Sequence, residues 1–429
     1  MLFKEISVLD KDYNVQENMY VGISEDRIRY IGKAAPSEDF GQVFEGKNRL
    51  LMSAFYNAHA HSPMALMRGY GENLALMDWL NTRIFPFEDK LCGNAVYWGT
   101  LLCMAESLRY GIVSSSDMYY FTSDMVRAVA ESGAKANISR AIANPMGAPL
   151  ESLPSVKEAE DAVRLYHGAE NGRIIIDASI HAEYTSNEET VKYVADMAKQ
   201  SDLRMHVHLS ETKSEHAECK ARRGGLTPAQ YFERCGIFDV PALAAHCVWC
   251  EDEDFDILKE KGVTAATNPV SNLKLASGIA QVSEMMNRGI RVAIGTDSVA
   301  SNNNLSFFEE MKTFAILAKT KTMDPTVVTP KEALKAATVS GALAQGRYDC
   351  GVIEEGNKAD FIVLRTDVPN MHPVHNMLNN IVYSACDADI AMTVADGKIL
   401  YKDGEYTTID IEKTIFEAEA ATKEILKQL

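Results

Sequence analysis

Two histidines separated by one residue, His59 and His61, follow an apolar run in "RLLMSAFYNAHAH". Alternate residues of a β-strand point to the same side, so both imidazoles can reach one ion. "HVHLSE" adds His208 and, three residues later, Glu211, while "AIGTDS" adds Asp297. Three imidazoles and one carboxylate form a ligand set suited to Zn²⁺ or Fe²⁺, with a position left for water. The sequence therefore predicts a metal site made of His59, His61, His208 and Asp297.

These residues fall where predicted strands end. Eight short apolar segments alternate with helical ones along the middle of the chain: "RLLMSAFYNAHAH", "GIVSSSDM", "KANISRAI", "RIIIDASIHAE", "LRMHVHLSE", "PALAAHCVW", "VTAATNPV" and "RVAIGTDS". Eight such units are typical of an α/β protein with a (β/α)8 TIM-like barrel, whose strand ends converge on one mouth where catalytic residues gather. An open doubly wound sheet is the alternative, but no G-x-G-x-x-G motif follows any strand.

The histidines favour a single metal ion. Six of the ten lie at or near the ends of predicted strands: His59, His61, His181, His206, His208 and His246. His206 points the same way as His208 from a deeper position, and we interpret it as a packing residue or a support for a ligand. A two-metal site would need a bridging ligand such as a carboxylated lysine, and "SIHAEYT" contains no lysine. We therefore expect one divalent metal per subunit, zinc first, with iron and manganese as alternatives.

The two ends of the chain differ in pattern from the middle. "MYVGISEDRIRYIG" and "AMTVADGKILYKDGEY" alternate apolar and polar residues and contain turn signals. We predict that residues 1–52 and 355–408 together form a small β-sandwich domain beside a barrel of residues 53–354. Residues 409–429, rich in Ala, Glu and Lys, are predicted to form an amphipathic C-terminal helix.

The composition narrows the class of partner. The chain has 429 residues and a net charge of −17, which disfavours nucleic acid and anionic membrane surfaces. Its eight scattered cysteines, including Cys247 and Cys250 in a C-x-x-C motif, are typical of reduced thiols. The first residues lack the basic and apolar regions of a signal peptide. We expect a cytoplasmic protein that acts on a small molecule, with no nucleic-acid or membrane partner; the sequence leaves a homo-oligomer open.

Four motifs resemble the amidohydrolase superfamily, and most closely its 5-methylthioadenosine/S-adenosylhomocysteine deaminase branch. They are "NAHAHSPMALMRGYGENLALMDWL", "AAHCVW", "NPVSNLKLASGIAQV" and "GTDSVASNNNLSFFEEM", and "GNKADFIVL" extends the resemblance toward the C-terminus. The resemblance implies a metal-dependent hydrolase that deaminates a 6-aminopurine nucleoside. The substrate would be adenosine, 5′-methylthioadenosine or S-adenosylhomocysteine, and the products would be the 6-oxo nucleoside and ammonia.

The resemblance also implies catalytic roles for individual residues. It assigns metal ligation to the same four residues, His59, His61, His208 and Asp297. Glu211 would carry a proton to the ring nitrogen of the substrate. His246 would orient the attacking water and, with Asp297, accept its proton.

Further positions match substrate-binding residues of this branch. Glu72, in "GYGEN", matches the glutamate that holds the ribose hydroxyls. His181 matches a histidine that contacts the purine, and Arg140, in "NISRAI", matches an arginine of the substrate pocket. Glu211 and Asp297 would also contact the substrate. Trp79 is interpreted as either a core residue or a pocket wall.

The sequence departs from the branch at two places. A second arginine that would hold the carboxylate of a homocysteine tail is absent, since "NPMGAPLESLPSVKEAED" has no basic residue before Lys157. We therefore expect adenosine or methylthioadenosine to be preferred over S-adenosylhomocysteine. Ser298 and Val299 stand where smaller residues are usual, and they would narrow the pocket beside the metal.

Two alternative functions follow from the same residues. The first is hydrolysis at a different aromatic heterocycle: guanine, an oxidised purine, a pterin or a triazine. The second is a non-catalytic relative that kept the barrel, which is disfavoured because such relatives usually lose metal ligands. A role for Glu72 would separate the first alternative from a nucleoside deaminase, because a free base offers no diol.

Overall fold

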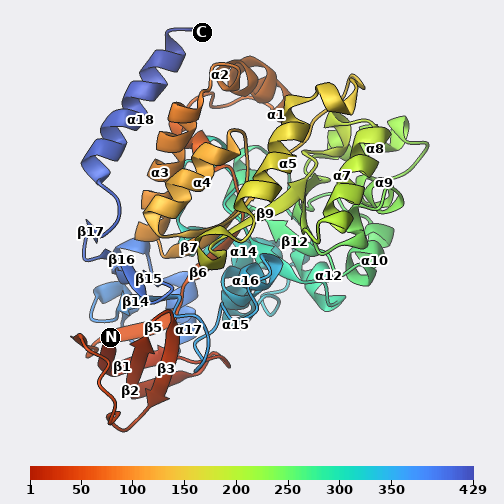
Figure 1. Cartoon of the computed structure of the whole chain (residues 1–429). Coiled ribbons are helices and arrows are strands. Elements are labelled where there is room, and N and C mark those ends of the chain that lie inside the picture. The colour runs from red at the N-terminus through yellow and green to blue at the C-terminus, as the bar shows by residue number, and fades with distance from the viewer.

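Eight parallel strands form the central barrel of the computed structural model, which describes all residues from 1 to 429 (Figure 1). They are β6 (Phe55–Ala60), β7 (Ile112–Met118), β8 (Lys135–Ser139), β9 (Ile174–Ser179), β10 (Met205–Leu209), β11 (Ala242–His246), β12 (Thr264–Thr267) and β13 (Val292–Ile294). They pair in chain order, and a parallel bridge between Ala60 and Asp297 brings the last strand back to the first. The predicted (β/α)8 barrel is confirmed.

Helices pack around the barrel; those up to residue 287 link its strands, and the later ones follow the last barrel strand (Figure 1). They are α1 (Leu76–Trp79), α2 (Phe85–Glu88), α3 (Gly93–Arg109), α4 (Thr122–Ser132), α5 (Pro154–Tyr166), α6 (Ala169–Gly172), α7 (Glu188–Gln200), α8 (Lys213–Arg222), α9 (Pro228–Arg234), α10 (Asp252–Glu260), α11 (Pro269–Lys274), α12 (Val282–Asn287), α13 (Val299–Asn302), α14 (Phe307–Thr322), α15 (Pro330–Ala337), α16 (Val339–Ala344), α17 (Met377–Tyr383) and α18 (Ile411–Leu426). A π-helical turn, Leu80–Ile84, joins α1 to α2. No helix combines the length and the apolar character that crossing a bilayer requires.

A second sheet contains strands from both ends of the chain, which lie side by side in Figure 1. Its nine strands are β1 (Leu2–Leu9), β2 (Val15–Ser24), β3 (Arg27–Gly32), β4 (Val43–Glu45), β5 (Arg49–Ser53), β14 (Phe361–Arg365), β15 (Ile390–Ala395), β16 (Lys398–Lys402) and β17 (Glu405–Tyr406). The two ends meet where β5 pairs antiparallel with β14. One residue separates β5 from β6, so the chain passes directly from this sheet into the barrel.

The closure of the barrel positions the first histidine. The amide of Asp297 donates a hydrogen bond to the carbonyl of His59 over 2.9 Å. Gly295, between β13 and Asp297, lies so close to β6 that a Cβ added there would stand 2.8 Å from the Cβ of His59. Glycine is the one residue without a Cβ, so only glycine permits this approach. The turn after β13 therefore brings Asp297 beside the imidazole of His59.

The turn after β10 is fixed by the start of α8. Thr212 caps the helix by accepting a hydrogen bond from the Glu215 amide over 3.1 Å. In return, the Glu215 carboxylate accepts from the amides of Glu211 (2.6 Å) and Thr212 (3.3 Å). This capping box holds Glu211 at a defined place just beyond the strand end.

Candidate active site

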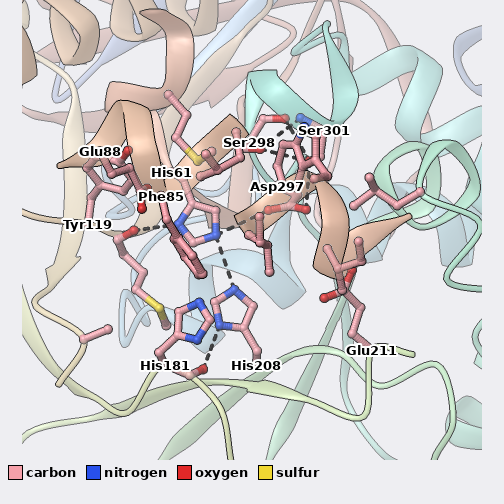
Figure 2. Close-up of a pocket in the computed structure, with 18 of the residues that line it drawn as sticks. His61, Phe85, Glu88, Tyr119, His181, His208, Glu211, Asp297, Ser298 and Ser301 are labelled. Atoms are coloured by element: carbon pink, nitrogen blue, oxygen red, sulfur yellow. Dashed lines mark hydrogen bonds and ion pairs between the residues drawn. The ribbon is translucent and has the colours of Figure 1, made fainter. Parts of the chain in front are cut away.

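His61 and His208 face each other through their Nε2 atoms, while the Nδ1 atom of each ring is already used as a hydrogen-bond donor. The Nδ1 of His61 donates to the carbonyl of Met118 over 2.6 Å, and the Nδ1 of His208 donates to the carbonyl of His181 over 2.8 Å. In a neutral imidazole the other nitrogen then carries a lone pair. These two Nε2 atoms lie 3.3 Å apart (Figure 2). Two lone pairs at this distance repel each other unless a cation binds both.

His59 and Asp297 complete the same cluster of acceptors. The Oδ1 atom of Asp297 lies 3.4 Å from the Nε2 of His59 and 3.4 Å from the Nε2 of His61. The Nε2 of His59 is fully buried and has no hydrogen-bond partner. Because buried polar atoms are nearly always satisfied, such an atom requires an explanation. A cation bound by all four residues supplies one.

The protonation states suit ligation. Burial lowers the pKa of His59 to about 3 and lowers the pKa of His208 well below its ordinary value. Both imidazoles are therefore neutral at physiological pH, which is the form that binds metals. The donor set, three imidazoles with one carboxylate, is that of a divalent metal site.

Hydrogen bonds outside the cluster orient its members. The Nδ1 of His59 lies 2.9 Å from the Nε2 of His206, so His206 supports His59 from deeper in the barrel. The second carboxylate oxygen of Asp297 accepts from the hydroxyls of Ser271 (2.5 Å) and Ser301 (3.0 Å). These bonds turn Oδ1 toward the histidines. Partners of this kind commonly fix the orientation of metal ligands.

Glu211 and His246 lie beside the cluster. The Nε2 of His246 is 3.8 Å from Oε2 of Glu211, and the hydroxyl of Ser277 donates to the other oxygen over 3.1 Å. Burial raises the pKa of the Glu211 carboxyl, which favours its protonated form. Burial alone would lower the pKa of His246, but the carboxylates of Glu211 and Asp297 raise it above its ordinary value. The pair can therefore exchange protons with a molecule bound next to the metal site.

Backbone strain is concentrated at the same place. His246 has a φ of 73° and Asp297 a φ of 60°, both in the left-handed region. Non-glycine residues in this region cost on the order of 1–3 kcal/mol and cluster at functional sites. His246 is the last residue of β11, and Asp297 follows β13. At these positions the left-handed backbone directs each side chain into the cavity.

The cavity above the cluster has one apolar wall. We call residues 76–88, which comprise α1, the π-helical turn and α2, the wall helix. It contributes these lining residues: Leu76, Trp79, Leu80, Ile84, Phe85 and Glu88. Trp79 both lines the cavity and is buried in the hydrophobic core, so the two interpretations that the sequence left open hold together. Figure 2 shows Glu88 and Phe85 on the side of the cavity opposite Glu211.

Glu88 is a lining carboxyl that the sequence interpretation missed. It is partly buried at the end of α2 and accepts a hydrogen bond from the hydroxyl of Tyr120 over 3.2 Å. Burial raises its pKa to about 7. The sequence contains a pattern that could have identified Glu88. Leu80, Ile84 and Glu88 are spaced four residues apart and so share one helical face. A carboxyl on an otherwise apolar face is unusual and could have been noticed.

Two predicted substrate-binding residues do not line the cavity, whereas His181 does. The carboxylate of Glu72 pairs with Lys274 over 2.9 Å and accepts from the side-chain amide of Asn303 over 3.0 Å. Arg140 donates to a carboxylate of α5 instead of pointing into the cavity. His181 has a buried Nδ1 without a partner, and burial lowers its pKa to about 4.

Comparison with known proteins identifies the family of this chain. Residues 50–400 match the model of the amidohydrolase family. This chain belongs to the amidohydrolase family. It is 40% identical to the 5-methylthioadenosine/S-adenosylhomocysteine deaminase of Dictyoglomus thermophilum, over 100% of this chain and 99% of that protein. It is also 38% identical to the 5′-deoxyadenosine deaminase of Methanothermobacter thermautotrophicus, over 94% of each chain.

Solved structures of other proteins have the same overall fold as this chain. An adenosine deaminase from Xanthomonas campestris, crystallised with bound zinc, superposes with a TM-score of 0.91 at 28% identity. The similarity covers 99% of this chain and 98% of that one. Atrazine chlorohydrolase from Arthrobacter aurescens superposes with a TM-score of 0.89 at 21% identity, covering 98% and 99% of the two chains. That second likeness concerns the fold alone.

Proposed function

We propose that this chain hydrolyses the exocyclic C–N bond of 6-aminopurine nucleosides, giving the 6-oxo nucleoside and ammonia. The observation that supports the proposal is the convergence of three imidazoles and one carboxylate, side chains of the types that bind divalent metals, beside the buried carboxyl of Glu211. Full-length relatives that are named for the deamination of methylthioadenosine, S-adenosylhomocysteine and 5′-deoxyadenosine support the choice of substrate.

We further propose that His59, His61, His208 and Asp297 bind one zinc ion per subunit. A zinc-bound adenosine deaminase with the same fold supports the choice of metal. When bound, the metal would lower the pKa of a coordinated water from 15.7 to about 7 and so supply the nucleophile at neutral pH. The neutral imidazoles of His59 and His208 and the ionised carboxylate of Asp297 already have the protonation states that this role requires.

Glu211 is proposed to donate a proton to the purine nitrogen next to the carbon that is attacked. Its raised pKa keeps a proton available, and Ser277 fixes the direction of its carboxyl group. After attack, Glu211 regains a proton, the one that His246 or Asp297 took from the water, and can pass it to the departing amine. His246, held by the side-chain amide of Asn272 at 2.8 Å, and Asp297 are proposed to accept the proton of the attacking water. General acid–base catalysis of this type contributes about 10²–10⁴-fold.

Substrate recognition is proposed to use residues on both sides of the cavity. His181 is neutral and has a free ring nitrogen, so it can hydrogen-bond the purine base. Glu88 takes the ribose role that the family resemblance gave to Glu72, because Glu88 lines the cavity and Glu72 does not. An ionised carboxylate accepts two hydroxyls readily, and a ribose offers them as a diol.

The test is ammonia release from a panel of compounds, combined with metal analysis. We expect turnover of adenosine, 5′-deoxyadenosine and methylthioadenosine, and about one zinc ion per chain. Guanine and a triazine should be poor substrates. Efficient turnover of either one, with none of the nucleosides, would replace this proposal by the alternative of another heterocycle. A purified chain that neither contains nor binds a divalent metal would point to a non-catalytic relative.

A further inference from the structure

The carboxylate that binds Arg140 belongs to Glu158. We propose that Glu158 neutralises Arg140 and thereby restricts the enzyme to nucleosides without an anionic 5′ substituent. The inference rests on the proposed deaminase function and adds a residue that determines specificity. Glu158 acts through Arg140 and has no contact with the reacting atoms.

The ion pair is short and well shielded. The Nε of Arg140, just after β8, lies 2.6 Å from Oε2 of Glu158 on α5. A guanidinium nitrogen, Nη1, donates to the carbonyl of Ala141 over 2.6 Å. Only 14% of the Arg140 side chain and 29% of the Glu158 side chain are exposed. Charge-assisted hydrogen bonds of this length are about twice as strong as neutral ones.

Glu158 is held from a second direction. Its other oxygen, Oε1, accepts from the backbone amide of Thr122 over 2.8 Å and from the hydroxyl of Thr122 over 3.3 Å. Thr122 is the first residue of α4, where helix amides lack partners and favour a negative charge. The carboxylate therefore stays in place, and Arg140 stays paired with it.

Arg140 packs against residues that line the cavity. Its guanidinium lies 4.7 Å from the ring centre of Tyr120, and both Tyr120 and Ala141 line the cavity. The lining residues include no lysine or arginine, whereas four of them are acidic: Glu88, Glu211, Glu215 and Asp297. A substrate carboxylate that entered this cavity would meet these groups and a neutralised arginine. Without a cationic partner, a carboxylate that leaves water for this cavity loses its hydration without compensation, and this cost disfavours its binding.

The rest of the wall suits an uncharged substituent. The wall helix contributes Leu76, Leu80 and Phe85, and apolar groups of a ligand gain free energy when such side chains cover them. A methylthio group or a bare 5′ carbon satisfies this wall, whereas an amino-acid tail brings a carboxylate without a cationic partner. The structure thus favours 5′-deoxyadenosine and methylthioadenosine over S-adenosylhomocysteine.

The experiment compares Glu158→Gln with the wild-type enzyme on methylthioadenosine and S-adenosylhomocysteine. Glutamine keeps the shape of the side chain and frees the charge of Arg140. We expect the ratio of kcat/KM for S-adenosylhomocysteine to that for methylthioadenosine to rise about tenfold, mainly through a lower KM for the former. Turnover of methylthioadenosine should stay within about twofold, since uncharged tails do not involve Arg140.

Three variants serve as controls. Glu160 lies on the same helix, and its carboxylate accepts a hydrogen bond of 2.5 Å from the Tyr193 hydroxyl, outside the cavity lining. Glu160→Gln should therefore leave the ratio unchanged. Glu158→Asp keeps the charge and should retain the wild-type ratio. Adding Arg140→Met to Glu158→Gln should abolish the gain. A ratio that does not move in Glu158→Gln, or a gain that persists without Arg140, would overturn the inference.

A measurement on the wild-type enzyme avoids any effect of substitution on folding. S-Adenosylhomocysteine and its methyl ester differ by the charge of one group, and the ester should have a KM about tenfold lower. Equal KM values, or a preference for the free acid, would contradict the inference. If the wild-type enzyme deaminates no nucleoside at all, the proposed function is wrong. If it deaminates methylthioadenosine but does not distinguish the acid from the ester, only the inference on Glu158 is wrong.

Discussion

The floor and the wall of the cavity differ in how their side chains are held in place. The floor is formed at strand ends of the barrel, where His61 and His208 are each fixed by a hydrogen bond to a backbone carbonyl. The wall is formed by the wall helix, whose lining side chains are mostly apolar. Hydrogen bonds define direction, whereas apolar packing defines shape. This difference suggests that the floor performs the chemistry and the wall selects the molecule on which it acts.

Removing the acid of the floor should have the largest effect. Glu211→Gln cannot donate the proton that the ring nitrogen needs, and we expect kcat to fall about 10²–10⁴-fold while the metal content stays unchanged. Steady-state kinetics together with metal analysis check this. Glu218→Gln, in the helix that follows, is the matched control and should be active. A Glu211→Gln enzyme with normal kcat would remove Glu211 from the chemistry.

Weakening a support of the floor should have the second largest effect. His206→Phe removes the hydrogen-bond partner of His59 while filling a similar volume, and we expect metal affinity to fall about 10–100-fold. Competition with a chelator measures this affinity. His375→Phe, at an exposed histidine, should leave it unchanged. An unchanged affinity in His206→Phe would show that His206 only fills space.

Replacing Glu88, the one carboxyl of the wall, should weaken substrate binding. Glu88→Gln weakens hydrogen bonds from the ribose, and we expect KM for adenosine to rise about tenfold at pH 8 with little change in kcat. A nucleoside that lacks the 2′ and 3′ hydroxyls provides the control, because its KM should be the same in both enzymes. A raised KM for that compound too would indicate distortion of the wall.

The pH dependence of this effect has a definite sign. Burial raises the pKa of Glu88 to about 7, so the carboxylate that accepts hydroxyls is present above pH 7 and is lost as the pH falls. We therefore expect KM of the wild-type enzyme to rise below pH 7. This rise should be weaker in Glu88→Gln, which does not titrate. Parallel KM profiles of the two enzymes between pH 5 and pH 9 would contradict the assignment.

Glu72 should give the smallest effect. Its side chain is 35% exposed, and its carboxylate pairs with Lys274 outside the cavity. Such surface pairs contribute about 0–1 kcal/mol to stability. We expect Glu72→Gln to change KM for adenosine by less than about twofold. A tenfold rise would return the ribose-binding role to Glu72 and require the wall to move when substrate binds.

The sequence predicted the residues of the floor better than those of the wall, because the directions of the floor residues depend on their neighbours in the chain. His59 and His61 lie on one strand, and alternation along a strand fixes their common direction without knowledge of any other segment. The eight apolar segments that preceded the polar strand ends likewise predicted the barrel that brings those ends together. Glu72 and Glu88, by contrast, both follow the first barrel strand. Which of them faces the cavity depends on how the chain between β6 and α3 packs.

The sequence by itself determined that the chain forms a barrel, that four potential metal ligands stand at its strand ends, and that no basic residue follows Arg140 before Lys157. Only the tertiary structure decided that Glu88 rather than Glu72 lines the cavity and that Glu158 neutralises Arg140. The physical reason is that strand periodicity is set by neighbouring residues in the chain. The partner of a charged side chain depends on which other elements pack against it, and here that partner comes from a different helix.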